Sequence, residues 1–158
     1  MFENLIQILY NYVSNAGSVL NTEHSPTTYP NEFYYLSLIY ENDTWSIHGL
    51  WPQYNDGKYP SFCKEVEFDI NALQPIIDRL NVEWCSDIGS NDDFWEHEWK
   101  KHGSCMFCEN MTEFQYFNKA LELFEQVKKE DNIIEKYKKG TNKSMIPFDL
   151  NFNLLNIL

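Results

Sequence analysis

A dense cluster of ionisable side chains lies at residues 94–105, FWEHEWKKHGSC, which hold two histidines, two glutamates, two lysines and a cysteine. The histidines, His97 and His102, are five residues apart. On a regular helix of 3.6 residues per turn they would point about 140° apart. Zinc motifs of the H-E-x-x-H type place their histidines four residues apart, on one face. The spacing therefore favours an acid–base site over a metal site in this segment.

One face of this predicted helix would carry several chemically different groups. Five residues share it at the spacing i, i+4, i+7, i+8 and i+11: Phe94, Glu98, Lys101, His102 and Cys105. His97 lies at the edge of this face, one turn from Lys101. Such a face is usually a solvated surface of ion pairs, so a functional interpretation needs further reactive residues elsewhere in the chain.

A second candidate group is SIHGLWPQY, residues 46–54. His48 stands in an otherwise apolar strand, and Gly49 would let another backbone or a ligand approach closely. A single strand histidine is most often structural, but two imidazoles, a carboxylate and an ammonium together suit phosphoryl transfer. One imidazole would take a proton from the attacking hydroxyl and the other would give one to the leaving oxygen. The cation would stabilise charge that gathers on the phosphoryl oxygens.

The amino-acid composition and the net charge limit the classes of partner that the protein could bind. The chain has 158 residues, 43% of them hydrophobic, and a formal net charge of −12. This is enough apolar material for one domain, which we predict over residues 1–158. The acidity argues against a duplex-DNA binder and requires any phosphate site to be a local positive region, for which Lys100 and Lys101 are the best candidates. No stretch approaches the roughly 20 apolar residues of a membrane span, so we expect no membrane partner.

Four cysteines leave two interpretations open, since Cys63, Cys85, Cys105 and Cys108 could form disulfides or bind zinc.

The first 17 residues carry Glu3 and no lysine or arginine, which makes a poor secretion signal. Their apolar residues predict a short amphipathic helix instead: Leu5, Ile6, Leu9, Tyr12 and Val13.

Two strands, then three helices and a final strand must position these groups. We predict strands at 32–40, 45–50 and 146–154, a turn at 41–44 and a surface loop at 51–63. Helices are predicted at 72–82, with Pro75 in the first turn, at 94–102, and from Thr112 onward. Asp92 or Asp93 is expected to cap the second helix and Gly103 to end it.

Thr112 begins T-E-F-Q, a capping-box pattern, and the helix that follows has a predicted buried stripe: Phe114, Phe117, Leu121, Phe124 and Val127. Together these elements predict an α+β fold, an antiparallel sheet flanked by helices.

The segments IHGLWPQY and FWEHEWKKHGSC resemble the two active-site signatures of the T2-type ribonucleases, which are endoribonucleases of broad specificity. The strand FYYLSL and the helix FQYFNKALELF also resemble the family, so that the similarity covers about residues 33–130. The resemblance implies a T2-ribonuclease-like fold and cleavage of single-stranded RNA, through a 2′,3′-cyclic phosphate, to 3′-phosphate ends. It implies no metal and no cofactor, and DNA would not be cleaved because it lacks the 2′-hydroxyl.

The resemblance also implies individual roles. His48 matches the general acid and His102 the base that activates the ribose 2′-hydroxyl. Glu98 and Lys101 match the pair that stabilises the transition state, and His97 matches an auxiliary histidine that holds phosphate. Two aromatic residues match positions that contact the base upstream of the scissile phosphate: Trp51 and Phe94.

The family's shared disulfide would join Cys63 to Cys105, which leaves Cys85 and Cys108 as a second bridge or as free thiols. The resemblance further implies a monomer that is secreted or lysosomal or vacuolar, and the lack of a clear signal peptide leaves an intracellular or viral protein as the alternative.

The sequence departs from the family pattern in three places. The loop between the first two strands is very short, only nineteen residues follow Lys139, and Gln53 stands where some members carry a base-contacting aspartate. The fold is therefore expected to be shortened at the N-terminal loop and in the C-terminal part. An alternative function is a catalytically inactive T2-like domain that binds RNA or a partner.

Overall fold

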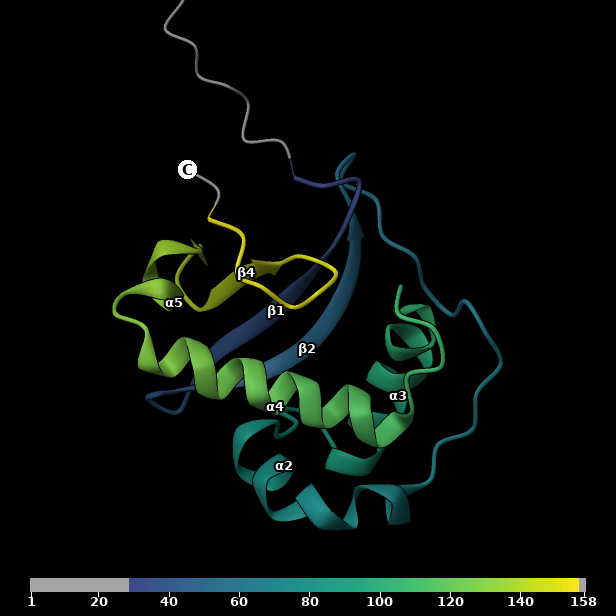
Figure 1. Cartoon of the computed structure of the whole chain (residues 1–158). Helices are drawn as coiled ribbons and strands as arrows, with labels where there is room; N and C mark the ends of the chain where they lie inside the picture. Colours follow the sequence, from purple (N-terminus) through teal and green to yellow (C-terminus); the bar gives the residue numbers. More distant parts are fainter. Residues whose placement is uncertain (1–28, 157–158) are drawn as a thin grey trace, which may run out of the picture. The chain divides into compact units, whose positions relative to one another are not determined.

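The computed structural model describes residues 29–156 (Figure 1). The predicted N-terminal amphipathic helix lies outside the described residues, and the prediction of one domain over 1–158 stays a prediction. Within residues 29–156, no helix is both long enough and apolar enough to cross a bilayer.

An antiparallel sheet forms the centre of the fold, in the order β2-β1-β4-β3. Its strands are β1 (Glu32–Glu41), β2 (Thr44–Tyr54), β3 (Lys138–Lys139) and β4 (Lys143–Phe148). Strands β1 and β2 form a hairpin that pairs Glu41 with Thr44. The two residues between them both have positive φ, as tight hairpin turns require. This confirms the predicted α+β architecture.

Strand β2 is longer than predicted, and the prediction of a surface loop is wrong for residues 51–54. Pro52 pairs with Tyr34 of β1 inside the ladder. Proline cannot donate a backbone hydrogen bond, but β2 is an edge strand of the described sheet, where a missing donor is tolerated. The pairing also shifts between Ser37 and Leu38, which face Gly49 and Ile47, so that His48 is the extra residue of a β-bulge.

The helical elements follow the predicted order with small changes at their ends. They are η1 (Ile70–Ile76), α2 (Ile77–Glu83), α3 (Asn91–Lys101), η2 (Gly103–Cys105), α4 (Glu113–Lys129) and α5 (Ile133–Lys136). Pro75 lies in the 3-10 segment η1, and the α-helix begins only after it. Thr112 caps α4 in a complete capping box with Gln115, as predicted.

The predicted cap of α3 is wrong, because Ser90 caps this helix in place of Asp92 or Asp93. The Ser90 hydroxyl accepts from the Asp93 backbone N–H and donates to the Asp93 carboxylate, so the aspartate is its partner. Helix α3 ends at Lys101, and Gly103 opens the short turn η2.

The predicted strand 146–154 is only partly present, because β4 ends at Phe148. The Asp149 carboxylate then accepts from the backbone N–H groups of Asn151 and Asn153. A local side-chain turn of this kind competes with the strand ladder and reverses the chain.

Helix α4 packs against β1 and β2, and α2 contacts both α4 and β2 (Figure 1). The stripe of α4 is buried as predicted except for Phe114, which is half-buried at the edge. The Tyr116 hydroxyl donates to the carbonyl of Leu50 and fixes the helix to β2. This packing buries one face of the sheet and leaves the other face free to form a site.

Candidate active site

A cavity of about 480 Å³ opens between β2 and α3 and is lined by all seven residues that the sequence places in the site: His48, Trp51, Phe94, His97, Glu98, Lys101 and His102. Two segments that are well separated in sequence thus contribute to one cavity. This gathers two imidazoles, an ammonium and a carboxylate around a space large enough for a small ligand.

His48 reaches the cavity from the bulge of β2. The indole N–H of the buried Trp84 donates to the His48 carbonyl at 3.1 Å and anchors the backbone there. The imidazole packs against the rings of Trp51 and Phe94, with centroids 5.1 and 5.8 Å away. An extra residue at a bulge re-aims its side chain, which accounts for a polar group pointing into the cavity from an apolar strand.

His102 lies directly after helix α3, where its backbone N–H donates to the Glu98 carbonyl at 2.9 Å. The Trp51 ring stacks on its imidazole at 5.2 Å between centroids. His97 and His102 both line the cavity, as the helical spacing predicts, with His97 at the edge of the face that Glu98, Lys101 and His102 share.

The Glu98 carboxylate is buried and held by Trp51. The Trp51 indole N–H donates to Glu98 Oε2 at 2.8 Å. Burial raises the pKa of Glu98 to about 7, although the Trp51 hydrogen bond and the Lys101 charge both act to lower it. A Cβ atom at Gly49 would overlap both Trp51 Nε1 and Glu98 Oε2, so this contact requires glycine at position 49.

Both site histidines have a lowered pKa. Burial lowers the pKa of His102 to about 3, helped by the positive charges of Lys101, His97 and His48. Burial also lowers the pKa of His48, as does Lys143, against an opposing effect of Asp87. His102 is therefore neutral over a wide pH range and available as a proton acceptor, while a bound anion would favour protonation of either imidazole.

One ring nitrogen of each histidine, Nδ1 of His48 and Nδ1 of His102, is buried without a hydrogen-bond partner among the described residues. A buried polar atom without a partner costs stability. Packing alone does not explain why two polar rings were placed here.

The sequence matches the model of the Ribonuclease T2 family over residues 19–144, most of the chain. The chain belongs to the ribonuclease T2 family. Among curated T2-family relatives, ribonuclease DdI of Dictyostelium discoideum is 45% identical over 85 residues, which cover 53% of this chain and 38% of the relative. Extracellular ribonuclease LE of Solanum lycopersicum is 40% identical over 85 residues, which cover 51% of this chain and 37% of the relative.

The aligned segment thus spans less than two fifths of the length of these relatives. Among solved structures, RNase NT in complex with 5′-AMP matches with a TM-score of 0.62 at 22% identity, over 80% of this chain and 89% of that chain. This likeness confirms a T2-ribonuclease-like fold.

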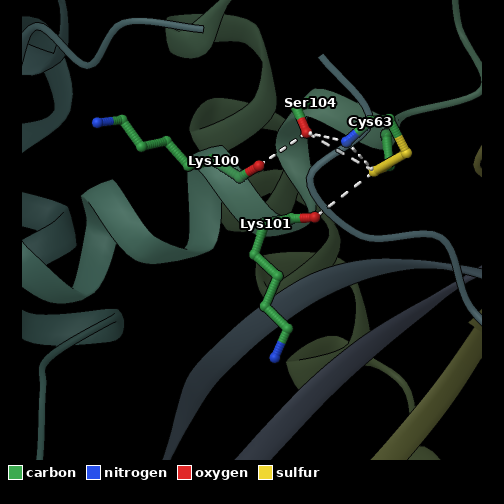
Figure 2. Close-up of a disulfide and its surroundings, with 5 residues drawn as sticks. Cys63, Lys100, Lys101 and Ser104 are labelled. Carbon is green, nitrogen blue, oxygen red and sulfur yellow. Dashed lines mark hydrogen bonds between the residues drawn. A yellow bond between two sulfur atoms is a disulfide. The ribbon is translucent and has the colours of Figure 1, made fainter. Parts of the chain in front are cut away.

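The T2-family chain contains the expected Cys63–Cys105 disulfide. The Cys63 backbone N–H donates to the Ser104 hydroxyl, which in turn donates to the Lys100 carbonyl, and the bridge thereby ties the loop after β2 to the end of α3 (Figure 2). Cys85 is a free, exposed thiol and Cys108 a free, half-buried one. The second bridge is therefore absent, and a four-cysteine zinc site is ruled out because two of its members are joined.

Four further residues line the cavity of this T2-family chain: Gln53, a departure from the family pattern in the sequence, and Gly57, Tyr59 and Met145, which the sequence did not single out. Gln53 lies two residues after Trp51 on β2 and so projects from the same face, which the loop prediction concealed. Tyr59 is carried in by the disulfide-tethered loop, with its ring 6.3 Å from that of His102.

Proposed function

We propose that the chain is an endoribonuclease that cleaves single-stranded RNA, without a metal or cofactor, by attack of a ribose 2′-hydroxyl on the adjacent phosphate. The products would be a 2′,3′-cyclic phosphate end, later opened to a 3′-phosphate, and a free 5′-hydroxyl. One observation carries the proposal: His48 and His102, from different elements, line the same cavity together with Lys101 and Glu98.

In this reaction His102 would accept the proton of the 2′-hydroxyl, and its lowered pKa keeps it neutral for that role. His48 would donate a proton to the departing 5′-oxygen. Its pKa is low in the free protein, and the charge of the bound phosphate would raise it into the working range.

Lys101 and Glu98 would stabilise the charge of the phosphorane-like transition state. Lys101 supplies a fixed positive charge. With its pKa raised to about 7, the Glu98 carboxyl carries a proton below neutral pH and can donate a hydrogen bond to a phosphoryl oxygen. His97 would hold a neighbouring phosphate oxygen from the same cavity.

Flat rings beside the two imidazoles would contact the base upstream of the scissile bond. Trp51 stacks on His102 and, with Phe94, lies beside His48, while Tyr59 lies near His102, so that a base in this part of the cavity could stack on an aromatic ring. We propose that Gln53 adds a hydrogen bond to the base beside Trp51 and contributes to base preference. DNA would bind without being cut.

The Cys63–Cys105 bridge favours an oxidising compartment, in line with a secreted, lysosomal or vacuolar protein. An intracellular or viral location, and a monomeric state, stay predictions.

The test is cleavage of an end-labelled RNA by the wild type and by His48→Phe and His102→Phe. If each imidazole transfers a proton, each variant should lose roughly 10²–10⁴ in rate. A strand with a 2′-deoxy sugar on the 5′ side of every phosphate should stay intact. Full activity in both variants would overturn the mechanism, and RNA binding without cleavage by the wild type would instead indicate the inactive binding domain.

A further inference from the structure

A positive segment lies far from the active-site motifs in the sequence. Residues 136–143, KYKKGTNK, hold four of the 12 lysines and arginines in a chain that has 24 acidic residues. They fall on α5, β3 and the start of β4. In so acidic a protein, a concentration of positive charge marks a surface that attracts anions.

Two of these lysines are direct neighbours on the sheet. Lys139 of β3 pairs with Lys143 of β4 in the antiparallel register, so their side chains project from the same face. Like charges directly opposite each other destabilise a sheet. Among residues 29–156, neither ammonium has a carboxylate partner to offset this repulsion, whereas Lys138, the residue before Lys139, pairs with Glu135.

The face that carries this pair is the face of the active-site cavity. Lys143 and Met145 are two residues apart on β4 and project from the same side, and Met145 lines the cavity. The intervening Ser144 is buried on the opposite side. The lysine pair is therefore an extension of the catalytic face and not part of the surface over α4.

The pair lies on the His48 side of the cavity. Lys143 is directly opposite Ile39 of β1, and Ile39 and His48 together line a second, smaller cavity that also includes Phe94. The charge of Lys143 lowers the pKa of His48, as expected for two groups that share this surface. A strand that leaves the catalytic centre past His48 would therefore meet Lys143 and then Lys139.

We propose that Lys139 and Lys143 form a phosphate-binding subsite for the RNA strand downstream of the cleaved bond. This inference rests on the proposed function, in which His48 protonates the 5′-oxygen and so faces the nucleotide on the 3′ side. Phosphates further along that strand neutralise the two ammonium groups, which removes the repulsion between them. The subsite recognises the backbone and carries no base preference.

Binding of a fluorescent single-stranded 2′-deoxy-oligonucleotide, which the enzyme cannot cleave, tests the subsite without relying on activity. Anisotropy titrations across a salt series give the slope of log Kobs against log salt. Each phosphate contact contributes about 0.7 to that slope for single strands, so Lys139→Ala/Lys143→Ala should lower it by about 1.4. The matched control, Lys128→Ala/Lys129→Ala on α4, removes the same charge elsewhere and should leave the slope unchanged.

A kinetic experiment tests the direction of the strand. The substrate is a DNA strand with one ribonucleotide, of the base that the wild type cleaves fastest, placed near its 5′ end or near its 3′ end. The double variant should lose more kcat/KM on the first substrate, which has the long downstream arm. Equal losses on both would mean that Lys143 acts only through His48 and would overturn the subsite.

An unchanged salt slope in the double variant, or an equal fall of the slope in the control variant, would overturn the phosphate subsite as well. If the wild type fails to cleave RNA but the slope still falls by about 1.4, the proposed activity is wrong and the phosphate subsite stands.

Discussion

The hydrogen bond from Trp51 to Glu98 joins the two active-site segments, and Trp51→Phe removes it while keeping an aromatic ring beside His102. Because the Glu98 carboxyl is protonated below neutral pH, the bond is one between neutral groups, which contributes about 0.5–1.5 kcal/mol. If Glu98 acts on the transition state, kcat should fall about 2- to 13-fold at acidic pH, since each 1.36 kcal/mol is tenfold. The donor also lowers the pKa of Glu98, so the variant should raise that pKa further.

Steady-state kinetics on RNA across a pH series separate this role from base binding. Loss of a base contact raises KM, whereas a misplaced Glu98 lowers kcat and shifts its pH dependence. Trp45→Phe is the matched control, because Trp45 is on the same strand and packs against Tyr40, away from the lining of the cavity. An unchanged kcat with a raised KM in Trp51→Phe would refute the positioning role.

Gly49→Ala perturbs the same contact from the backbone side. The added methyl group would overlap both partners of the hydrogen bond, and the variant should reproduce the loss of kcat. Circular dichroism and thermal unfolding identify a variant that has simply failed to fold. A well-folded Gly49→Ala protein with wild-type kcat would also contradict the reasoning.

Three further predictions follow from the charges and the disulfide. Lys101→Ala should lose roughly 3 kcal/mol of transition-state stabilisation, measured as kcat/KM. Lys100→Ala should change kcat/KM little, because the Lys100 side chain pairs with Glu96 and leaves the helix in another direction (Figure 2). Equal losses in the two variants would contradict the role assigned to Lys101. In a profile of kcat/KM against pH, the acid limb should lie near pH 3, where His102 becomes protonated. As the pH rises, kcat/KM should fall again when His48 loses its proton, at a pH lower than is usual for a histidine because its pKa is lowered. The optimum should therefore be acidic, and an optimum above neutrality would count against these roles. Cys63→Ala breaks the Cys63–Cys105 bridge, which spans 42 residues, and should lower the free energy of unfolding in urea by about 3–4 kcal/mol. Cys85→Ser removes a free thiol and should leave the free energy of unfolding unchanged. Similar urea midpoints for the two variants would refute the stabilising role of the bridge.

The residues that line the cavity were largely predictable from local sequence, because most of them are concentrated in two short segments. Helix periodicity correctly placed Glu98 and Lys101 on one wall. It also grouped Cys105 with them, although α3 ends at Lys101 and Cys105 lies in the next turn, bonded to Cys63. Periodicity fails where a helix ends.

Long-range pairing decided what local sequence could not predict. Proline and turn-forming residues after Trp51 indicated a loop, but an edge strand tolerates Pro52, and so β2 continues and presents Gln53 to the cavity. The bulge at His48 depends on the register between two strands. Met145 reaches the site only because β4 pairs with β1, a contact between segments that are far apart in the chain.

The central claim is that two imidazoles, acting on one phosphate, use the neighbouring 2′-hydroxyl as the nucleophile. Its most direct test is to digest a dinucleoside monophosphate in the presence of a chelator and to follow the products by phosphorus NMR. A 2′,3′-cyclic phosphate should form first and convert slowly to a 3′-phosphate, and both should form roughly 10²–10⁴ times more slowly with His102→Phe. A 5′-phosphate product, or cleavage that stops when metal is removed, would contradict the central claim.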